Sequence, residues 1–283
     1  MFRFIHRVLA AIAVCTFSAS RADAGYTYLG DPPSKWDIGP NAASEHAFIA
    51  PAGPGTPGNA TFSIVPAGRT FDNAADTAHG ANHTAAITAL GVPGFGDEGD
   101  YAALFDWALD SWARVSGFTN LGQVIDSGAN IGATDADGGA IGDIRIAAWE
   151  LSSSSLVAHA FQPGTEAIYG LGGTVAGDLH IDVNRNWVDD PLATASTSRF
   201  DIYTIVLHEM GHALGLGHSS VRGSVMENAY RGAKRELTAD DLAAIRAVYG
   251  VPEPSTLVLA TIALLTAAFA HQACQAQRRQ QQS

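Results

Sequence analysis

The chain has 283 residues, a length that accommodates one large domain or two small ones. Its formal net charge of −12 at pH 7 predicts a surface that repels nucleic acids, so a nucleic-acid partner is not expected. The two cysteines, Cys15 and Cys274, lie in the terminal segments, which excludes disulfides and thiol chemistry from the part between them. No pattern indicates an oligomer, and we expect a monomer.

Residues 1–24 have the pattern of a secretory signal peptide. Arg3 and Arg7 precede an apolar run from Val8 to Phe17, and Ala22-Asp23-Ala24 has the small-x-small pattern of a cleavage site. The alternative is an N-terminal membrane anchor, for which the apolar run is short. Export is therefore expected. Residues 25–56, rich in Gly, Pro, Ala and Asn, are interpreted as an N-terminal extension with Lys35-Trp36 as an isolated anchor.

The next part of the chain is expected to contain a loop, one long helix and five strands. Residues 67–95 are expected to form a loop. From about Asp97 to Val115 the apolar residues recur at helical spacing, which predicts an amphipathic helix with its Trp side chains in the core. Alternation of apolar and polar residues and short apolar runs predict strands at 61–65, 121–125, 143–148, 156–161 and 179–183.

A second helix is expected at about 199–214, and the most informative motif begins on it. Residues 208–218 read His-Glu-Met-Gly-His-Ala-Leu-Gly-Leu-Gly-His. His208 and His212 are four residues apart, so on a helix they lie on one face and can bind the same metal ion. Gly215 can adopt a positive φ, which would turn the chain and bring His218 back as a third ligand.

Three neutral imidazoles leave the fourth position of a zinc ion open for water, as in catalytic rather than structural sites. Glu209 would then hold the zinc-bound water and accept its proton. A last helix is expected at 237–249, with Thr238 as its N-cap and Asp240 and Asp241 in its first turn.

The extended motif, with Met226 eight residues after His218 and Ser219 directly after it, resembles the metzincin metallopeptidases and, within them, the matrixin branch. The resemblance implies a single α+β catalytic domain at 57–250, with a mixed, twisted sheet of about five strands, three helices and an active-site cleft. It also implies a Met-turn at Met226 and a zinc endopeptidase that acts on protein or peptide substrates through a water activated by Glu209.

Two alternatives to the peptidase stay open. One is a zinc-stabilised surface or extracellular-matrix binding module without turnover, against which the presence of Glu209 argues. The other is a hydrolase of non-peptide amides that uses the same zinc chemistry.

The resemblance also assigns secondary sites. His159 and His180 match two ligands of a structural zinc in matrixins, but the other two ligands are missing from the loop Leu151–Ser155, so we predict no second zinc. Structural calcium is expected, and Asp143 and Asp178 are the candidate ligands of one ion. Asp182 matches a ligand of a second calcium ion, a weaker prediction because Arg185 stands where its acidic partner is expected. Tyr230, Ala158 and Ala160 are expected to border the substrate pocket, with the strand at Ala158 pairing with an extended peptide.

The C-terminal segment 251–283 has a pattern of its own. Val251-Pro-Glu-Pro-Ser255 is followed by an apolar run from Leu257 to Ala270 and by Arg278-Arg279, and no Asp, Glu, Lys or Arg lies between Glu253 and Arg278. This order resembles the PEP-CTERM sorting tail of Gram-negative bacteria. The resemblance implies temporary anchoring in the inner membrane, processing by an exosortase and delivery to the cell surface or extracellular matrix. The alternative is a permanent tail anchor.

Overall fold

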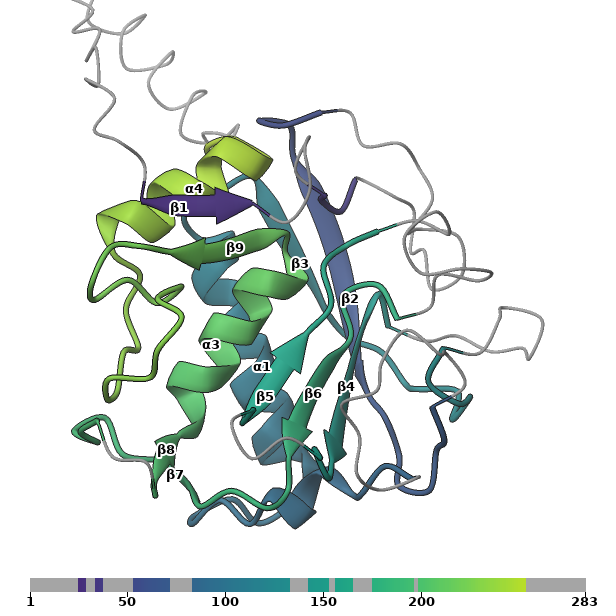
Figure 1. Ribbon diagram of the computed structural model, residues 1–283. Coiled ribbons are helices and arrows are strands. Elements are labelled where there is room, and N and C mark those ends of the chain that lie inside the picture. The colour runs from purple at the N-terminus through teal and green to yellow at the C-terminus, as the bar shows by residue number, and fades with distance from the viewer. Residues whose placement is uncertain are drawn as a thin grey trace, which may run out of the picture.

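The computed structural model describes residues 25–28, 34–37, 53–71, 83–132, 142–152, 156–164, 175–195 and 198–252. At its centre is a five-stranded sheet in the order β3-β2-β4-β6-β5 (Figure 1). The first four strands run parallel, and β5 is antiparallel to β6, so the sheet is mixed. The strands are β2 (Gly58–Ile64), β3 (Phe118–Gln123), β4 (Ile144–Trp149), β5 (Ala158–Ala160) and β6 (Leu179–Asp182).

The helix predicted from Asp97 is α1 (Glu98–Ala113). Asp97 caps it, because its side chain accepts hydrogen bonds from the main-chain N–H groups of Gly99 and Asp100. The face that carries Leu104, Ala108 and Trp112 is fully buried, as the helical spacing of these residues predicts. Burial of each large side chain stabilises the fold by about 1.5–3 kcal/mol.

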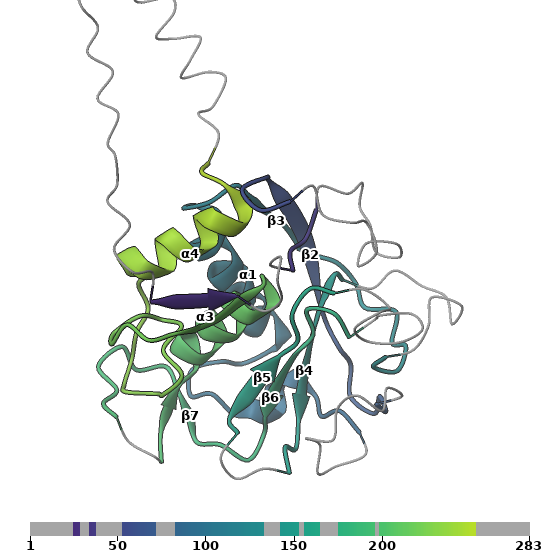
Figure 2. The same cartoon turned by 45° about the horizontal axis from the view of Figure 1, so that its top comes forward.

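Helix α3 (Ile202–Ala213) packs against α1 and carries the first part of the motif (Figure 2). Asp201 is its N-cap, and most of its side chains are buried. Its apolar residues pack into the core, and its polar residues Thr204, His208, Glu209 and His212 line the cleft. Helix α4 (Ala239–Tyr249) begins with the predicted cap: Thr238 and Asp241 form a reciprocal capping box. The α+β fold with a five-stranded mixed sheet and three α-helices in the described part of the chain confirms the expected architecture.

Four short strands and one short helix were not predicted. β1 (Tyr26–Tyr28) pairs with β9 (Leu216–Ser219), and β7 (Trp187–Val188) pairs with β8 (Phe200–Asp201). The 3₁₀-helix η2 (Ile87–Leu90) lies in a segment that we expected to be loop. Elements of two to four residues show little periodicity of their own. The equally short β5 and β6 were predicted because they lie in the longer runs 156–161 and 179–183.

The strand predicted at 121–125 was misplaced. The observed strand, β3, starts at Phe118, which is buried, whereas Leu121 is 41% exposed and Ile125 is 89% exposed. These exposed apolar side chains produced the misleading signal. Trp36, the predicted anchor, is 2% exposed and belongs to the main core.

None of the helices in the described ranges combines the length and the apolar character needed to cross a membrane. The predicted signal peptide and the apolar run of the predicted sorting tail lie outside the described residues.

Candidate metal centre and substrate cleft

The structure brings His208, His212 and His218 together. One ligand atom from each imidazole lies within 4.8 Å of the others, and no further group of three metal-ligating side chains this close occurs in the described residues. The Nε2 atoms of His212 and His218 are 3.3 Å apart. Two nitrogens bound to one tetrahedral zinc at 2.0–2.1 Å would be separated by about 3.3 Å, so these residues fit a zinc ion.

Main-chain carbonyls determine which nitrogen of each helical imidazole carries the proton. Nδ1 of His208 lies 2.7 Å from the Val225 carbonyl oxygen, and Nδ1 of His212 lies 2.7 Å from the Leu216 carbonyl oxygen. A carbonyl oxygen only accepts hydrogen bonds, so both Nδ1 atoms must donate, which leaves both Nε2 lone pairs available for a metal.

Burial keeps the imidazoles neutral, as metal ligands must be. Burial, together with the neighbouring imidazoles, lowers the pKa of His208 to about 4 and that of His212 to about 3. Burial also lowers the pKa of His218, which is the exposed member of the three.

Glu209 points into the same cleft. Its carboxylate is buried, and its Oε2 atom has no hydrogen-bond partner among the described residues. The pKa of Glu209 is raised to about 8, because the effect of burial outweighs the lowering by a hydrogen bond from the Ala160 main chain. A carboxylate with a free oxygen and a raised pKa is suited to accept a proton near neutral pH.

The turn after α3 has the conformation that the motif predicts. Gly215 has φ +96°, a conformation that residues with a side chain rarely adopt. A Cβ atom at this position would also lie 2.0 Å from the Ser34 carbonyl oxygen, so both the backbone conformation and the lack of space require glycine. Met226 is fully buried, and its Sδ atom would lie 2.3 Å from a Cβ added at Gly211. The sulfur therefore packs directly against the helix between the two predicted ligands, as expected of a Met-turn.

The three histidines and Glu209 line a cleft of about 760 Å³. Ala158 and Ala160 on the edge strand β5 border it, as does Tyr230. The Tyr230 hydroxyl accepts a hydrogen bond from the Asp201 main-chain N–H, and its ring packs against Phe200. All three predicted pocket residues are thus at the cleft.

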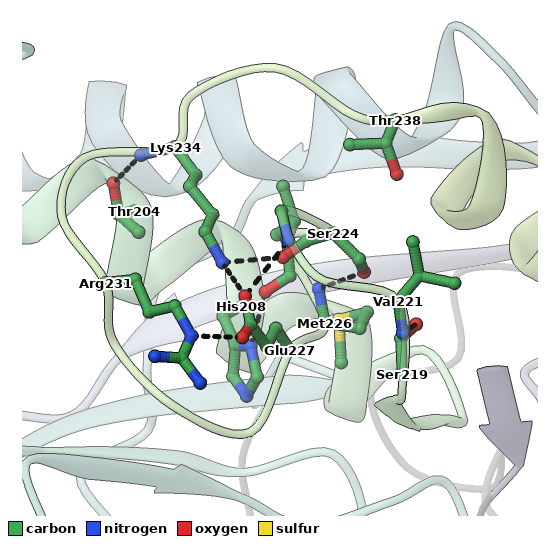
Figure 3. Close-up of polar contacts among 12 residues, drawn as sticks. Thr204, His208, Ser219, Val221, Ser224, Met226, Glu227, Arg231, Lys234 and Thr238 are labelled. Atoms are coloured by element: carbon green, nitrogen blue, oxygen red, sulfur yellow. Dashed lines mark hydrogen bonds and ion pairs between the residues drawn. The ribbon is translucent and has the colours of Figure 1, made fainter. Parts of the chain in front are cut away.

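A network of charges holds the loop that follows Met226 (Figure 3). Glu227 accepts hydrogen bonds from the side chains of Arg231 and Lys234 and from the main-chain N–H of Gly223. Lys234 also donates to the Ser224 carbonyl oxygen. The hydrogen bond from Lys234, with that from Arg231, lowers the pKa of Glu227 to about 2.

Glu227, Arg231 and Lys234 all line the cleft, although no motif in the sequence marked them as site residues. The one available signal was the opposite charge of Glu227 and Arg231 four residues apart. That spacing predicts contact on a helix, and this segment is a loop.

His159 and His180 are cross-strand neighbours in β5 and β6, with ring centroids 4.9 Å apart in an edge-to-face arrangement. The rings of Phe71 and Phe161 also pack against His180. The two imidazoles are therefore together in an aromatic cluster. No third ligand joins them in the described ranges, which omit residues 153–155 and 165–174.

The calcium candidates have different surroundings. The Oδ2 atom of Asp143 accepts hydrogen bonds from the main-chain N–H and the hydroxyl of Thr61. Asp178 is fully buried, and burial raises its pKa well above the usual range. Its Oδ2 atom has no hydrogen-bond partner among the described residues, which is consistent with a cation ligand.

Asp182 already has a positive charge beside it, because its Oδ2 atom is 2.7 Å from Nε of Arg185. Its Oδ1 atom accepts a hydrogen bond from the Asn184 main-chain N–H. The side chain of Arg185 therefore lies beside the Asp182 carboxylate, where a second calcium ion would bind.

Comparison with known proteins agrees with this geometry. The matrixin family model matches residues 100–250, which include the three histidines and Glu209. The chain is 38% identical over 100 residues to karilysin of Tannerella forsythia, an alignment that covers 35% of this chain and 19% of karilysin. It is 43% identical over 95 residues to rat (Rattus norvegicus) matrilysin, which covers 32% of this chain and 31% of matrilysin.

Human (Homo sapiens) neutrophil collagenase is 37% identical over 103 residues, covering 35% of this chain and 19% of the collagenase. The chain thus spans less than a third of the length of each of these relatives. The match to the family model is more extensive and covers more than half of the chain. On this basis the chain belongs to the matrixin family, whose members are zinc-dependent metalloendopeptidases with structural calcium.

Proposed function

We propose that this chain is an endopeptidase that hydrolyses peptide bonds in extended protein segments, with zinc held by His208, His212 and His218. The observation that carries the proposal is the free Oε2 atom of Glu209 in the same cleft as three clustered imidazoles. In two of them, His208 and His212, the hydrogen bond of Nδ1 leaves the Nε2 lone pair available for a metal. A site that only stabilises structure does not need an unpaired carboxylate oxygen beside it.

Zinc bound there would supply a Lewis acid that polarises a carbonyl and lowers the pKa of water. Glu209 takes the proton of the attacking water on its Oε2 atom and later delivers it to the leaving amine. Its burial favours this exchange, because the raised pKa brings the carboxyl close to the pH at which it must both accept and release the proton.

Strand β5 orients the substrate in this proposal. It has a neighbour in the sheet on one side only, β6, and its other side borders the cleft. An extended peptide added antiparallel or parallel to Ala158–Ala160 would place its main chain next to Glu209. The Tyr230 ring then walls the pocket that takes the side chain following the scissile bond.

A test of this function uses the chain with zinc and a set of quenched peptides and unstructured proteins. We expect cleavage that a chelator abolishes and zinc restores, and a loss of at least about a thousandfold in kcat/KM for Glu209→Ala with zinc content unchanged. Glu236→Ala, which removes an exposed carboxylate from the loop before α4, is the matched control and should cleave normally.

The second candidate, a zinc-stabilised binding module, makes the opposite prediction. It would bind one zinc per chain, cleave none of the substrates and keep its biological effect in Glu209→Ala. Cleavage of amidated sugars but of no peptide would instead favour the hydrolase of non-peptide amides.

We also propose the arrangement of the whole chain: a signal peptide at 1–24, an N-terminal extension at 25–56, the catalytic domain at 57–250 and a PEP-CTERM tail at 251–283. The tail would hold the protein in the inner membrane of a Gram-negative bacterium until an exosortase releases it to the cell surface or matrix. The order of Pro252-Glu253-Pro254, apolar run and Arg278-Arg279 supports this proposal.

Mass spectrometry of the protein recovered from its own host tests the arrangement. We expect a mature chain that starts at Gly25 and lacks the apolar run and Arg pair. A recovered chain that retains Arg278-Arg279 and stays with the membranes would favour the permanent anchor.

A further inference from the structure

Two N-terminal segments, residues 25–28 and 34–37, contact the turn that leads from α3 to His218. They lie outside residues 100–250, the part matched by the family model. We infer that these segments position His218, so that the strength of zinc binding depends on residues far from the motif. This inference rests on the proposed zinc site.

The first segment forms β1, which pairs with β9, the strand that carries His218 (Figures 1 and 2). Tyr26 is paired with Ser219, and Tyr28 with Leu216, so the pairing extends over both sides of the ligand. The Thr27 hydroxyl donates a hydrogen bond of 2.8 Å to the His218 carbonyl oxygen. β1 therefore fixes the main chain of the ligand itself.

Contact between the two strands is close at Gly217. A Cβ atom at this position would lie 2.3 Å from Oγ1 of Thr27, so the hydroxyl occupies the space that a side chain would need. Beyond the ligand, the main-chain N–H of Gly25 and the Ser219 hydroxyl both donate to the Asp240 carboxylate at the start of α4. The strand pair is thus joined to a helix of the core.

The second segment fixes the other end of the turn. The Trp36 indole donates a hydrogen bond of 2.9 Å to the Ala213 carbonyl oxygen, at the last residue of α3. The Trp36 main-chain N–H donates to the Tyr249 hydroxyl, which in turn donates to the Leu214 carbonyl oxygen. Two consecutive carbonyl groups of the turn are therefore held through one buried tryptophan.

The three ligands differ in how much they need this support. His208 and His212 lie on α3, a helix that is buried in the core. His218 is exposed and lies on a strand of four residues whose partner is β1. Without the N-terminal contacts, a metal would have to order this strand on binding, and ligands that are not held in place bind metals less tightly.

The turn also bears on His212, because the Leu216 carbonyl oxygen accepts the hydrogen bond from Nδ1 of His212. Tyr28 in β1 is paired with Leu216. The N-terminal segments therefore reach two of the three imidazoles, one through its main chain and the other through the acceptor that sets its tautomer.

The experiment measures the zinc dissociation constant of the full chain by competition with a chelator of known affinity. Thr27→Val removes the hydroxyl at nearly constant volume and is expected to weaken zinc binding by roughly threefold to tenfold. Trp36→Phe removes the indole donor and is expected to weaken it by about tenfold or more. Thr27→Ser keeps the hydroxyl and is expected to bind zinc with the same affinity as the parent.

The visible absorption of Co²⁺ bound in place of zinc supplies a second readout, because it reports ligand geometry and not global stability. We expect shifted bands for Thr27→Val and parent-like bands for Thr27→Ser. Thr84→Val is the matched control: its hydroxyl donates to the Pro66 carbonyl oxygen, remote in sequence from the motif. It should lower the thermal midpoint and leave zinc affinity and the Co²⁺ spectrum unchanged.

Parent-like zinc affinity in both Thr27→Val and Trp36→Phe would overturn this inference and leave the proposed function intact. So would an equal loss of affinity in Thr84→Val, or a Thr27→Ser variant that behaves like Thr27→Val. If the parent chain binds no zinc, the proposed function and this inference both fail.

Discussion

Glu227 follows Met226 directly, and its carboxylate is surrounded by donors from three other positions in the same loop. Arg231, Lys234 and the main-chain N–H of Gly223 all donate to it. The side chain is 8% exposed, so its ion pairs are less screened by solvent than pairs on an open surface. One carboxylate therefore holds together the loop that borders the cleft.

This arrangement predicts how stability depends on pH. The pKa of Glu227 is lowered from 4.5 to about 2, so its contribution to stability is complete above about pH 4.5 and is lost as the pH falls through 2. Glu227→Gln should lower the free energy of unfolding by about 1–2 kcal/mol at pH 7. Between pH 4.5 and 2 its thermal midpoint should fall less steeply than that of the parent.

Glu236→Gln, which changes an exposed carboxyl in the same part of the chain, is the control and should follow the parent curve. Parallel curves for Glu227→Gln and the parent over this pH range would contradict the assignment of the lowered pKa to Glu227.

At the scale of elements, α3 and the segment at Met226 are fitted to each other at Gly211. A Cβ atom on Gly211 would lie 2.3 Å from Sδ of Met226 and 3.1 Å from the Trp112 ring. An alanine in a helix is intrinsically favoured over glycine by about 1 kcal/mol. The overpacking costs about 1–3 kcal/mol and should outweigh this gain.

Gly211→Ala is therefore expected to destabilise the fold by up to about 2 kcal/mol and to weaken zinc binding, because it displaces the helix between two predicted ligands. Met226→Ala alone should cost about 2–5 kcal/mol through the cavity it leaves. The double variant should be more stable than the sum of the two losses predicts, by about 1 kcal/mol or more. Chemical denaturation of all four chains measures this coupling, and strictly additive losses would rule out the contact.

The elements that could be predicted are those with a long period or a fixed local signal. The apolar spacing of α1 and the Thr238–Asp241 cap of α4 are properties of adjacent residues, so the sequence shows them directly. The metal centre was predicted for the same reason, since His208, Glu209 and His212 lie on one helix and His218 follows one glycine turn.

The contacts that were not predicted join segments that are distant in the chain or that are too short to show a periodic pattern. β1 and β9 are separated by almost the whole domain, and each is only three or four residues long. Their pairing depends on the completed fold and not on local preference. The same holds for Trp36, whose partners Ala213 and Tyr249 become neighbours only when α3 and α4 have packed.

At the scale of the whole molecule, zinc binding and folding should be coupled. The three histidines come from a helix and a strand, and the unfolded chain does not bring them together. Free zinc at a thousand times its dissociation constant should therefore stabilise the fold by about 4 kcal/mol, and a chelator should lower the thermal midpoint accordingly. His218→Ala should greatly reduce this response. A midpoint that the chelator leaves unchanged in the parent would show that zinc adds nothing to stability.

The ion pairs around the cleft bear on how well the protein resists cleavage by other copies of itself. An endopeptidase with the proposed preference for extended segments is expected to cut copies of itself wherever a loop unfolds into the cleft of another molecule. The loop after Met226 is closed onto itself by Glu227 and Lys234, and Arg235 joins it to the buried Asp201 at the start of α3. We therefore expect these ion pairs to protect the wall of the cleft against autolysis, at a place where a cut would destroy activity.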